Sequence, residues 1–323
     1  MAVLVLGAGE LGTAMLKSLT AHPSRPIDSS VSVLLRPSTI NSPDAAKVKL
    51  IAKVKAQGIS IEAGDVVNDS VQDLADIFAK YDTVVSCTGF VGPTGTQRSI
   101  CEAALLGKVR RFIPWQFGVD YDVIGRGSPQ VLFDEMLDVR DTLRAQKEVA
   151  WVVISTGLFM SFLFVKDFGV VDFEEKRLRA LGGWDVEVTL TGPDDIADMT
   201  AGVVYDPRGI PGDGRNVVYV SGDTVSYKRA ADLIEQRFPE VKFTRENWDM
   251  ALLEENLRND PTDTWNKYRA IFGAGKGVSW PSEVTLNSER GIKLEDLETF
   301  LKKMETPDAI QLVKEKQKDG FMC

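Results

Sequence analysis

A glycine-rich turn near the start of the chain most constrains its fold. The turn, GAGELG at residues 7–12, directly follows the apolar run 3–6. After it, Leu11, Met15 and Leu19 recur at the four-residue spacing of an amphipathic helix. Strand, glycine turn and helix in this order are typical of a dinucleotide-binding unit. The pattern predicts a nucleotide-binding α/β protein; the alternative is a glycine turn that binds nothing.

The residues of this turn have separate predicted roles. Gly7 permits the tight turn, Gly9 lets the backbone approach a pyrophosphate, and Gly12 brings the helix close to the strand. Glu10 and Leu11 open the helix, whose N-terminus has a partial positive charge that attracts phosphates. We therefore expect all five residues to contact a bound cofactor.

The end of the second strand predicts which dinucleotide is bound. The apolar run 31–35 has the composition of a buried parallel strand, and Arg36, Pro37 and Ser38 follow it. A site that prefers NAD has an acidic side chain at this place, which binds the ribose 2′-hydroxyl. A planar, permanently charged guanidinium instead suits a 2′-phosphate. The sequence favours NADPH, with a solvated surface arginine as the alternative.

Composition excludes several other classes of protein. The net charge of −9 over 323 residues argues against nucleic-acid binding, which requires clustered Lys and Arg. Cys87, Cys101 and Cys323 lack the spacing of metal ligands, which predicts a reducing, cytoplasmic setting and no metal. The most apolar stretch, 157–165, is too short to span a membrane. We expect a protein without a signal peptide or membrane association.

Strand and helix patterns alternate through the first half of the chain. This repetition predicts a Rossmann-type, doubly wound parallel sheet with helices on both faces. We expect a NADP(H)-binding domain over residues 1–157 and a smaller, mostly helical substrate-binding region over 158–323. The β-rich runs 186–190 and 216–220 lie in the second region, and such strands are expected to return to the main sheet.

Ligands of parallel α/β sheets bind beyond the carboxyl ends of the strands. Besides the glycine turn and Arg36, three segments follow predicted strands: 88–90, 115–117 and 157–159. We therefore expect the binding site to form where these segments meet.

Several familiar catalytic arrangements are absent from the sequence. His22 is the single histidine; Pro23 and Pro26 follow it, and we expect it to be exposed in a loop, which argues against a Ser-His-Asp triad or a histidine-based metal site. No GxSxG nucleophile elbow occurs. No tyrosine has a lysine four residues later, so the Tyr-x-x-x-Lys pair of ordinary short-chain dehydrogenases is missing. A reductase built on this chain needs another proton donor.

The segment RFIPWQFGVD at residues 111–120 resembles the RFIPSEFG segment of a known family. That family contains the isoflavone reductases and phenylcoumaran benzylic ether reductases, which are atypical short-chain dehydrogenases related to the NmrA-like proteins. The resemblance extends over residues 1–205 and includes the glycine turn, residues 36–38 and the Phe133-Asp134 step. The form IPWQFGVDYD looks like a fungal branch of this family.

The resemblance implies a Rossmann domain that binds NADPH and a smaller domain that closes over an aromatic substrate. It assigns Gly7, Gly9, Leu11 and Gly12 to the pyrophosphate, and Arg36 and Ser38 to the 2′-phosphate. It also places Thr88, Gly89 and Phe90 at the adenosine and ribose, and Trp115, Gln116 and Phe117 beside the nicotinamide.

One departure from the family affects its chemistry. The plant reductases have a general acid/base lysine at the end of an FDxK step, where this chain has Met136 after Phe133, Asp134 and Glu135. A thioether donates no proton, so the plant mechanism does not transfer. The first turn also reads GAGELG in place of the family's GxTGxxG. The resemblance therefore supports fold and cofactor more strongly than reaction.

Two residues are candidates for the missing proton donor. Lys166 follows an apolar run, and apolar surroundings would lower its pKa into a range that suits acid/base catalysis. Tyr121 follows the 115–118 segment and would supply a phenol. The alternatives are a lysine that reaches solvent from the surface and a tyrosine that only packs.

Four residues are expected to form the substrate-binding wall: Trp115, Met136, Gly157 and Phe159. For Trp115 and Phe159 the alternative is ordinary core packing.

The sequence as a whole predicts an NADPH-dependent reductase, monomeric or homodimeric, of a small aromatic or polyketide-like metabolite. Hydride would reach a carbonyl, enone or imine carbon, and the protein would position the reactants. Two other functions remain open. One is a non-catalytic, NmrA-like regulator that senses NADP(H); the other is a redox-neutral isomerase or cyclase with a vestigial cofactor site.

Overall fold

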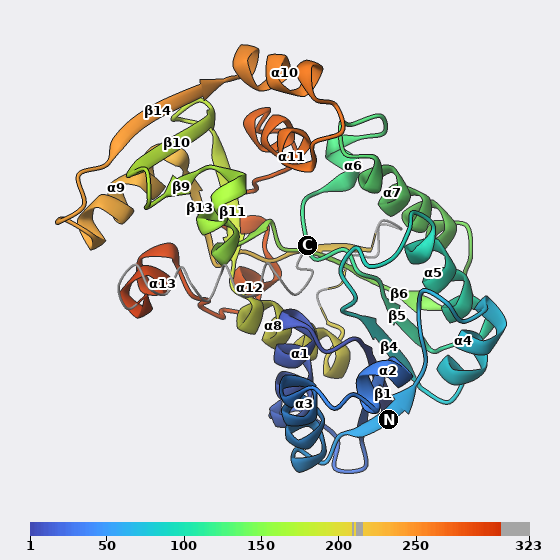
Figure 1. The fold of residues 1–323 in the computed structure, drawn as a ribbon. Helices are drawn as coiled ribbons and strands as arrows, with labels where there is room; N and C mark the ends of the chain where they lie inside the picture. The colour runs from blue at the N-terminus through green and yellow to red at the C-terminus, as the bar shows by residue number, and fades with distance from the viewer. Residues whose placement is uncertain (209, 211–215, 305–323) are drawn as a thin grey trace.

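Six parallel strands form the central sheet of the part of the chain that the structure describes, residues 1–208, 210 and 216–304 (Figure 1). The structure is a computed structural model. In their order across the sheet the strands are β3 (Ser60–Ala63), β2 (Ser30–Leu35), β1 (Ala2–Leu6), β4 (Thr83–Ser86), β5 (Arg111–Ile113) and β6 (Ala150–Trp151). The order reverses between β1 and β4, where doubly wound sheets bind their ligands. The predicted Rossmann-type fold class is confirmed.

Strand β1 shows why this part of the chain is so apolar. Val3 and Val5 face one core cluster, whereas Leu4 and Leu6 face a second cluster on the opposite side of the sheet. Both faces are therefore covered by helices. On the first face lie α1 (Glu10–Ala21), α3 (Ala45–Ala56) and α8 (Pro193–Tyr205). On the second lie α4 (Val71–Phe78), α5 (Thr96–Leu106) and α7 (Val131–Arg144).

The chain beyond residue 157 returns to the first half of the molecule, where it forms a separate two-stranded sheet. Strand β12 (Val217–Tyr219) pairs in parallel with β7 (Val153–Ser155), which continues the line of β6 after Val152. Helix α8 also packs along α1 (Figure 1). The second half of the chain thus contributes both a strand and a helix to the half that contains the central sheet.

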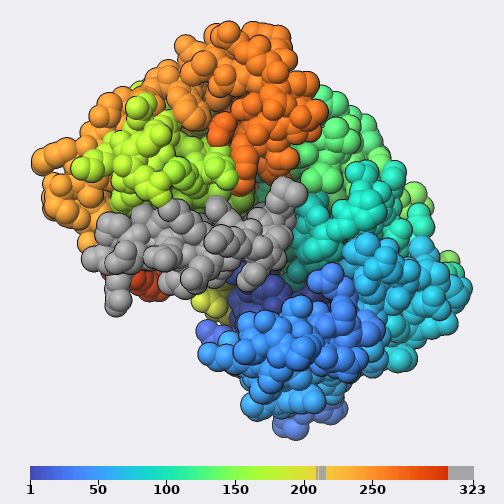
Figure 2. Space-filling view, viewed as in Figure 1, coloured from blue at the N-terminus to red at the C-terminus, as the bar shows by residue number. Residues whose placement is uncertain are grey.

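The remaining elements form two small sheets and their helices, which lie at one end of the molecule in Figures 1 and 2. One sheet contains β13 (Asp223–Ser226), β11 (Glu187–Thr191) and β8 (Leu158–Phe159); the other contains β14 (Thr244–Asp249), β10 (Arg177–Gly182) and β9 (Val171–Asp172). The helices are α9 (Tyr227–Arg237), α10 (Met250–Asn259), α11 (Thr264–Gly273), α12 (Leu286–Glu289) and α13 (Leu297–Lys303).

The sheet of β9, β10 and β14 is the main difference from the predicted, mostly helical second region. Its strands contain charged residues that hide their period. Arg179 on β10 lies opposite Glu246 on β14, and its Nε donates to a Glu246 carboxylate oxygen at 2.8 Å. Cross-strand ion pairs stabilise such strands where apolar alternation does not.

The structure describes two of the three cysteines and the helices of residues 1–304. Cys87 and Cys101 are buried and free, and Cys323 and the rest of 305–323 lie outside the described residues. None of the described helices combines the length and hydropathy that a membrane span requires.

Candidate functional site

The glycine turn brings helix α1 against strand β1 as its spacing predicts. Gly7 has φ +88°, a conformation that favours glycine. A Cβ added at Gly12 would lie 2.3 Å from the carbonyl oxygen of Gly7, so a side chain there would force the helix away from the turn. A Cβ added at Gly9 would meet nothing within 4 Å. Gly7 and Gly12 are thus needed for packing, while Gly9 borders open space.

The N-terminus of α1 is open to an incoming anion. Gly9 is its N-cap residue and provides no side-chain cap. The first backbone hydrogen bond of the helix runs from the Thr13 N–H to the Gly9 carbonyl at 2.9 Å. Among the described residues, none accepts from the backbone N–H groups of Leu11 and Gly12. Unsatisfied N–H groups at the positive end of a helix fit a pyrophosphate.

Arg36 directly follows β2, whose Leu34 carbonyl accepts from the Gly7 N–H of the glycine turn at 3.2 Å. Its side chain is exposed and forms no ion pair with a described residue. Pro37 and Ser38 follow it in α2 (Pro37–Ile40) and are also exposed. The nearby Asp65 is partly desolvated, which raises its pKa, but hydrogen bonds and the Arg36 charge together lower that pKa below its ordinary value. Arg36 is therefore available to a 2′-phosphate.

The turn after β4 is fixed by a neighbouring helix. The Gln97 side-chain amide on α5 donates to the Gly89 carbonyl at 2.8 Å and to Thr88 Oγ1 at 3.2 Å. Gly89 has φ +66°, which permits the turn. Phe90 follows, partly buried. Hydrogen bonds from Gln97 thus fix the Thr88–Gly89 backbone, which is expected to lie beside the adenosine and ribose.

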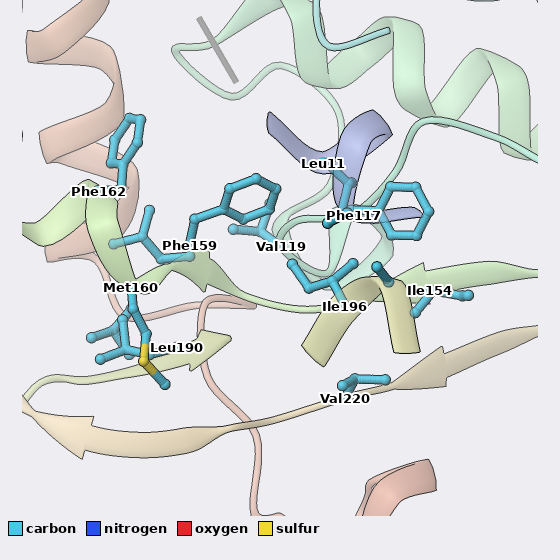
Figure 3. Close-up of a cluster of buried hydrophobic side chains, with 14 of the residues drawn as sticks. Leu11, Phe117, Val119, Ile154, Phe159, Met160, Phe162, Leu190, Ile196 and Val220 are labelled. Carbon is cyan, nitrogen blue, oxygen red and sulfur yellow. The ribbon is translucent and has the colours of Figure 1, made fainter. Parts of the chain in front are cut away.

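The segment after β5, which is predicted to lie beside the nicotinamide, is buried. Trp115, Gln116 and Phe117 are each at most 6% exposed. Trp115 and Phe117 pack edge to face at 5.8 Å between ring centroids, and Figure 3 shows Phe117 beside Leu11 of α1. The Gln116 amide donates to the carbonyl of Met136 at 2.9 Å, and its oxygen accepts from Arg140 at 2.6 Å. Both polar ends of the Gln116 side chain therefore bind α7, and its carbonyl accepts from the Gly118 N–H at 2.9 Å.

Arg140 is a structural centre that the sequence reasoning missed. Its guanidinium is fully buried, and besides Gln116 it donates to Asp122 at 2.7 Å and to Asp120 at 3.5 Å. Its Nη2 atom has no hydrogen-bond partner. Asp120 also accepts from the Tyr219 hydroxyl at 2.6 Å. A charged residue on the apolar face of a helix, seven positions after Phe133, was the available signal.

Tyr121 lies between the Arg140 network and the segment that follows β5. It begins α6 (Tyr121–Ile124), and its ring packs edge to face on Phe133 at 4.9 Å. The Arg140 guanidinium carbon lies 5.3 Å from the ring centroid. The phenol oxygen lies 3.1 Å from where a Gly118 Cβ would stand, against the backbone of the Trp-Gln-Phe-Gly segment. Tyr121 is thus a buried phenol beside a buried cation.

The apolar surroundings predicted for Lys166 are wrong. Residues 160–164 and 166–168 form two 3-10 turns that bury Phe162, Phe164 and Phe168 and direct the lysine outwards. The Lys166 side chain is 45% exposed and pairs with Glu174. This hydrogen bond raises its pKa instead of lowering it. The physical argument for Lys166 as the acid therefore fails.

The other predicted wall residues are packed into the core. Met136 is fully buried and Phe159 is 4% exposed. Gly157 has φ +71°, and its Cβ would lie 2.2 Å from the Thr189 carbonyl oxygen, so β11 occupies the space beside it. This close approach explains why position 157 needs a glycine, and the contact of Gly157 with substrate stays a prediction. Two buried hydroxyls at the end of β7, Ser155 Oγ and Thr156 Oγ1, lack a partner and were not singled out from the sequence.

One cavity of about 450 Å³ lies away from these strand ends, where α1 ends and α8 passes α12. His22 lines it, half-buried, with its ring 5.5 Å from that of Tyr205. Burial lowers the pKa of His22, against the opposing effect of Asp198 and with a smaller contribution from Arg290. The histidine predicted to be an exposed loop residue is thus partly enclosed. Over residues 1–208, 210 and 216–304 no cluster of metal ligands occurs.

Comparison with known proteins gives concordant matches. The chain is 49% identical over 300 residues to an NmrA-like family domain-containing oxidoreductase of Gibberella moniliformis, covering 93% of this chain and 97% of that protein. It is 26% identical to a phenylcoumaran benzylic ether reductase of Populus trichocarpa, over 70% and 72% of the two chains. The solved structure of AtPrR2 with NADP+ and (+)pinoresinol superposes with a TM-score of 0.74 at 20% identity, covering 93% and 97%.

The model of the NmrA-like family matches residues 1–255. This range includes the glycine turn, the Arg36 segment and the loop after β5. The resemblance noted in the sequence is confirmed, and the chain belongs to the NmrA-like family.

Proposed function

We propose that this protein is an NADPH-dependent reductase of a small aromatic or polyketide-like metabolite. The observation that carries the proposal is the open N-terminus of α1 beside the exposed, unpaired Arg36. The oxidoreductase relative and the NADP+ in the AtPrR2 structure support it.

In this proposal the chain binds NADPH at the reversal of the strand order. The N–H groups of Leu11 and Gly12 hold the pyrophosphate, and Arg36 with Ser38 holds the 2′-phosphate. Residues 88–90 contact the adenosine and ribose. When bound, NADPH supplies a hydride for a carbonyl, enone or imine carbon.

An aromatic substrate is supported by rings that continue outward from Tyr121. Phe133 contacts Tyr121 and lies 6.0 Å from Tyr268 of α11. Tyr268 lies 6.1 Å from Phe162, which lies 5.7 Å from Trp265. Trp265 is partly exposed. Phe133, Phe162 and Tyr268 are buried and pack on one another, so Trp265 is the member of this series that would offer edge and face contacts to a planar molecule. The pinoresinol in the AtPrR2 structure is an aromatic ligand of a protein with this fold.

We assign the proton donor to Tyr121. The substrate carbon gains the hydride, and the oxygen or nitrogen that was doubly bonded gains a proton from the phenol. Arg140, 5.3 Å from the ring centroid, would stabilise the phenolate left behind. Solvent then returns the proton to Tyr121.

Turnover with NADPH and an aromatic ketone or enone panel tests the proposal. A positioned acid contributes about 10²–10⁴-fold to rate, so Tyr121→Phe should lower kcat at least about 100-fold while leaving the Kd of NADPH unchanged. Near-parental kcat in this variant would exclude Tyr121 as the acid. Failure of the parent chain to bind NADPH would exclude the reductase itself.

A second function, an NADP(H)-sensing regulator, is favoured by two observations. Met136 is buried and replaces the plant lysine, and Tyr121 is only 3% exposed. A regulator would bind NADPH as tightly as a reductase does. It would not oxidise NADPH with any compound of the ketone and enone panel. The same titration and turnover assays therefore separate the two functions.

A further inference from the structure

The start of α5 is capped by a carboxylate from another helix. Gly95, with φ +106°, is the N-cap residue and has no side chain to satisfy the first N–H groups. Glu135 of α7 does so instead. Its two oxygens accept from the N–H groups of Gly95 at 2.9 Å, Gln97 at 2.8 Å and Arg98 at 3.2 Å. Glu135 is 4% exposed, so these bonds are shielded from water.

The same helix turn fixes the backbone beside the site. Gln97, whose backbone N–H binds Glu135, extends its side-chain amide to the Gly89 carbonyl and to Thr88 Oγ1. Gln97 is 6% exposed, so it has few other conformations available. A single residue thus joins the buried carboxylate to the turn after β4.

We infer that Glu135 is a positioning residue for the cofactor: through Gln97, it fixes the Thr88–Gly89 turn in the conformation that receives the adenosine and ribose of NADPH. The inference rests on the proposed function for the identity of the ligand. Glu135 itself need not touch the cofactor. A carboxylate that accepts three backbone N–H bonds sets both the direction of α5 and the place of its first side chains.

Glu135→Gln tests this inference in the full chain. The amide is similar in size but loses the negative charge and one acceptor oxygen. We expect the Kd of NADPH, measured by fluorescence titration, to rise about tenfold, corresponding to about 1.4 kcal/mol. Asp138→Asn is the matched control: it makes the same chemical change one turn further along α7, where the Asp138 side chain is 33% exposed and pairs with the Arg98 and Arg126 side chains. Its Kd should equal that of the parent.

A double-mutant cycle separates positioning from general stability. Gln97→Met keeps the backbone N–H that binds Glu135 but removes the amide that reaches the turn. If Glu135 acts through Gln97, the double variant should bind NADPH no more weakly than the weaker single variant. Kd effects that multiply in the double variant, or an unchanged Kd in either single variant, would overturn the inference.

Two further measurements keep the test decisive. Amide hydrogen exchange of residues 88–95 without cofactor should be faster in Glu135→Gln and unchanged in Asp138→Asn. If Glu135→Gln does not fold, Gln97→Met alone must still raise the Kd of NADPH about tenfold, or the inference is wrong. A parent chain that does not bind NADPH would instead contradict the proposed function and leave the exchange result to decide the mechanical link between Glu135 and the turn.

Discussion

Helices α1 and α5 start at the same edge of the sheet, after the neighbouring strands β1 and β4, yet their N-termini are satisfied in different ways. Both begin after a glycine, Gly9 or Gly95, that has no side chain to act as a cap. At α5 the buried Glu135 of α7 accepts the first N–H groups. At α1 no described residue accepts from Leu11 and Gly12. A helix start filled by an internal anion is structural, whereas an unfilled one is suited to an external anion.

The largest effect should come from filling the space at Gly9. Its φ of −71° is allowed for other residues and nothing lies within 4 Å of an added Cβ, so Gly9→Val should cost only the loss of a favourable N-cap, about 1 kcal/mol of unfolding free energy. The branched side chain would block the approach of a pyrophosphate to two charge-assisted N–H contacts. We expect the Kd of NADPH, measured by fluorescence titration, to rise about 100-fold, or about 2.8 kcal/mol.

Gly12→Ala is the opposite control, because its Cβ would meet a backbone oxygen. This variant should lose about 1–3 kcal/mol of unfolding free energy, measured by urea denaturation. If Gly9→Val loses stability and keeps its affinity for NADPH, the start of α1 is structural and the contrast with α5 disappears.

A substitution at Arg36 tests which dinucleotide binds at the open N-terminus of α1. Arg36→Asp should reduce the preference for NADPH over NADH by about tenfold to 100-fold, since a charge-assisted contact contributes about 1.5–3 kcal/mol. Calorimetric titration with both cofactors measures the ratio. Equal Kd values for the two cofactors in the parent chain would show that Arg36 contacts no phosphate.

A pH series tests the ion pairs of Arg140, which lies on α7, the helix that also contains Glu135. Burial raises the pKa of Asp122, but its hydrogen bond to Arg144 and the charge and hydrogen bond of Arg140 lower it to about 2, from an ordinary 3.8. The unfolded chain therefore takes up a proton first as pH falls, so this contribution is present above about pH 4 and is lost between about pH 4 and 2. Urea midpoints across this window should fall less steeply in Asp122→Asn. Parallel curves would show that Asp122 contributes nothing to the acid sensitivity.

The smallest effects should come from two residues singled out in the sequence. Met136→Leu nearly conserves volume at a buried position and should change kcat less than about threefold. Lys166→Met removes an exposed ion pair, which contributes little to stability, and should leave kcat unchanged. A 100-fold loss in either variant, with the fold intact by circular dichroism, would place that side chain at the reacting atoms.

Much of the fold could be predicted because it follows local rules. Periodicity identified β1, the glycine turn and α1, and strict steric needs at Gly7 and Gly12 confirmed the spacing argument. The strands β10 and β14 were missed because Arg179 and Glu246 are polar residues that become compatible with a sheet only when they face each other. Such a pairing joins residues 67 positions apart and leaves no local pattern.

The site was predictable only where the backbone defines it. Lys166 illustrates the limit: an apolar run shows that its neighbours are buried, but the turn geometry decides which way one lysine points. Glu135 and Arg140 were missed for the converse reason. Charged residues on a helix are expected in solvent. Only the packing of α7 between α5 and the loop after β5 shows that Glu135 and Arg140 are buried and bind neighbouring elements.

The pairing of β12 with β7 has a consequence for synthesis of the chain on the ribosome. The six strands of the central sheet are complete once residue 155 has emerged, but the outer edge of β7 gains its partner only when residues 217–219 follow. Val153 and Ile154 are almost fully buried in the finished protein, so an apolar strand edge remains uncovered while about 60 further residues are translated. At about 5–20 residues per second this interval lasts several seconds, during which the nascent chain is open to aggregation or to chaperone binding.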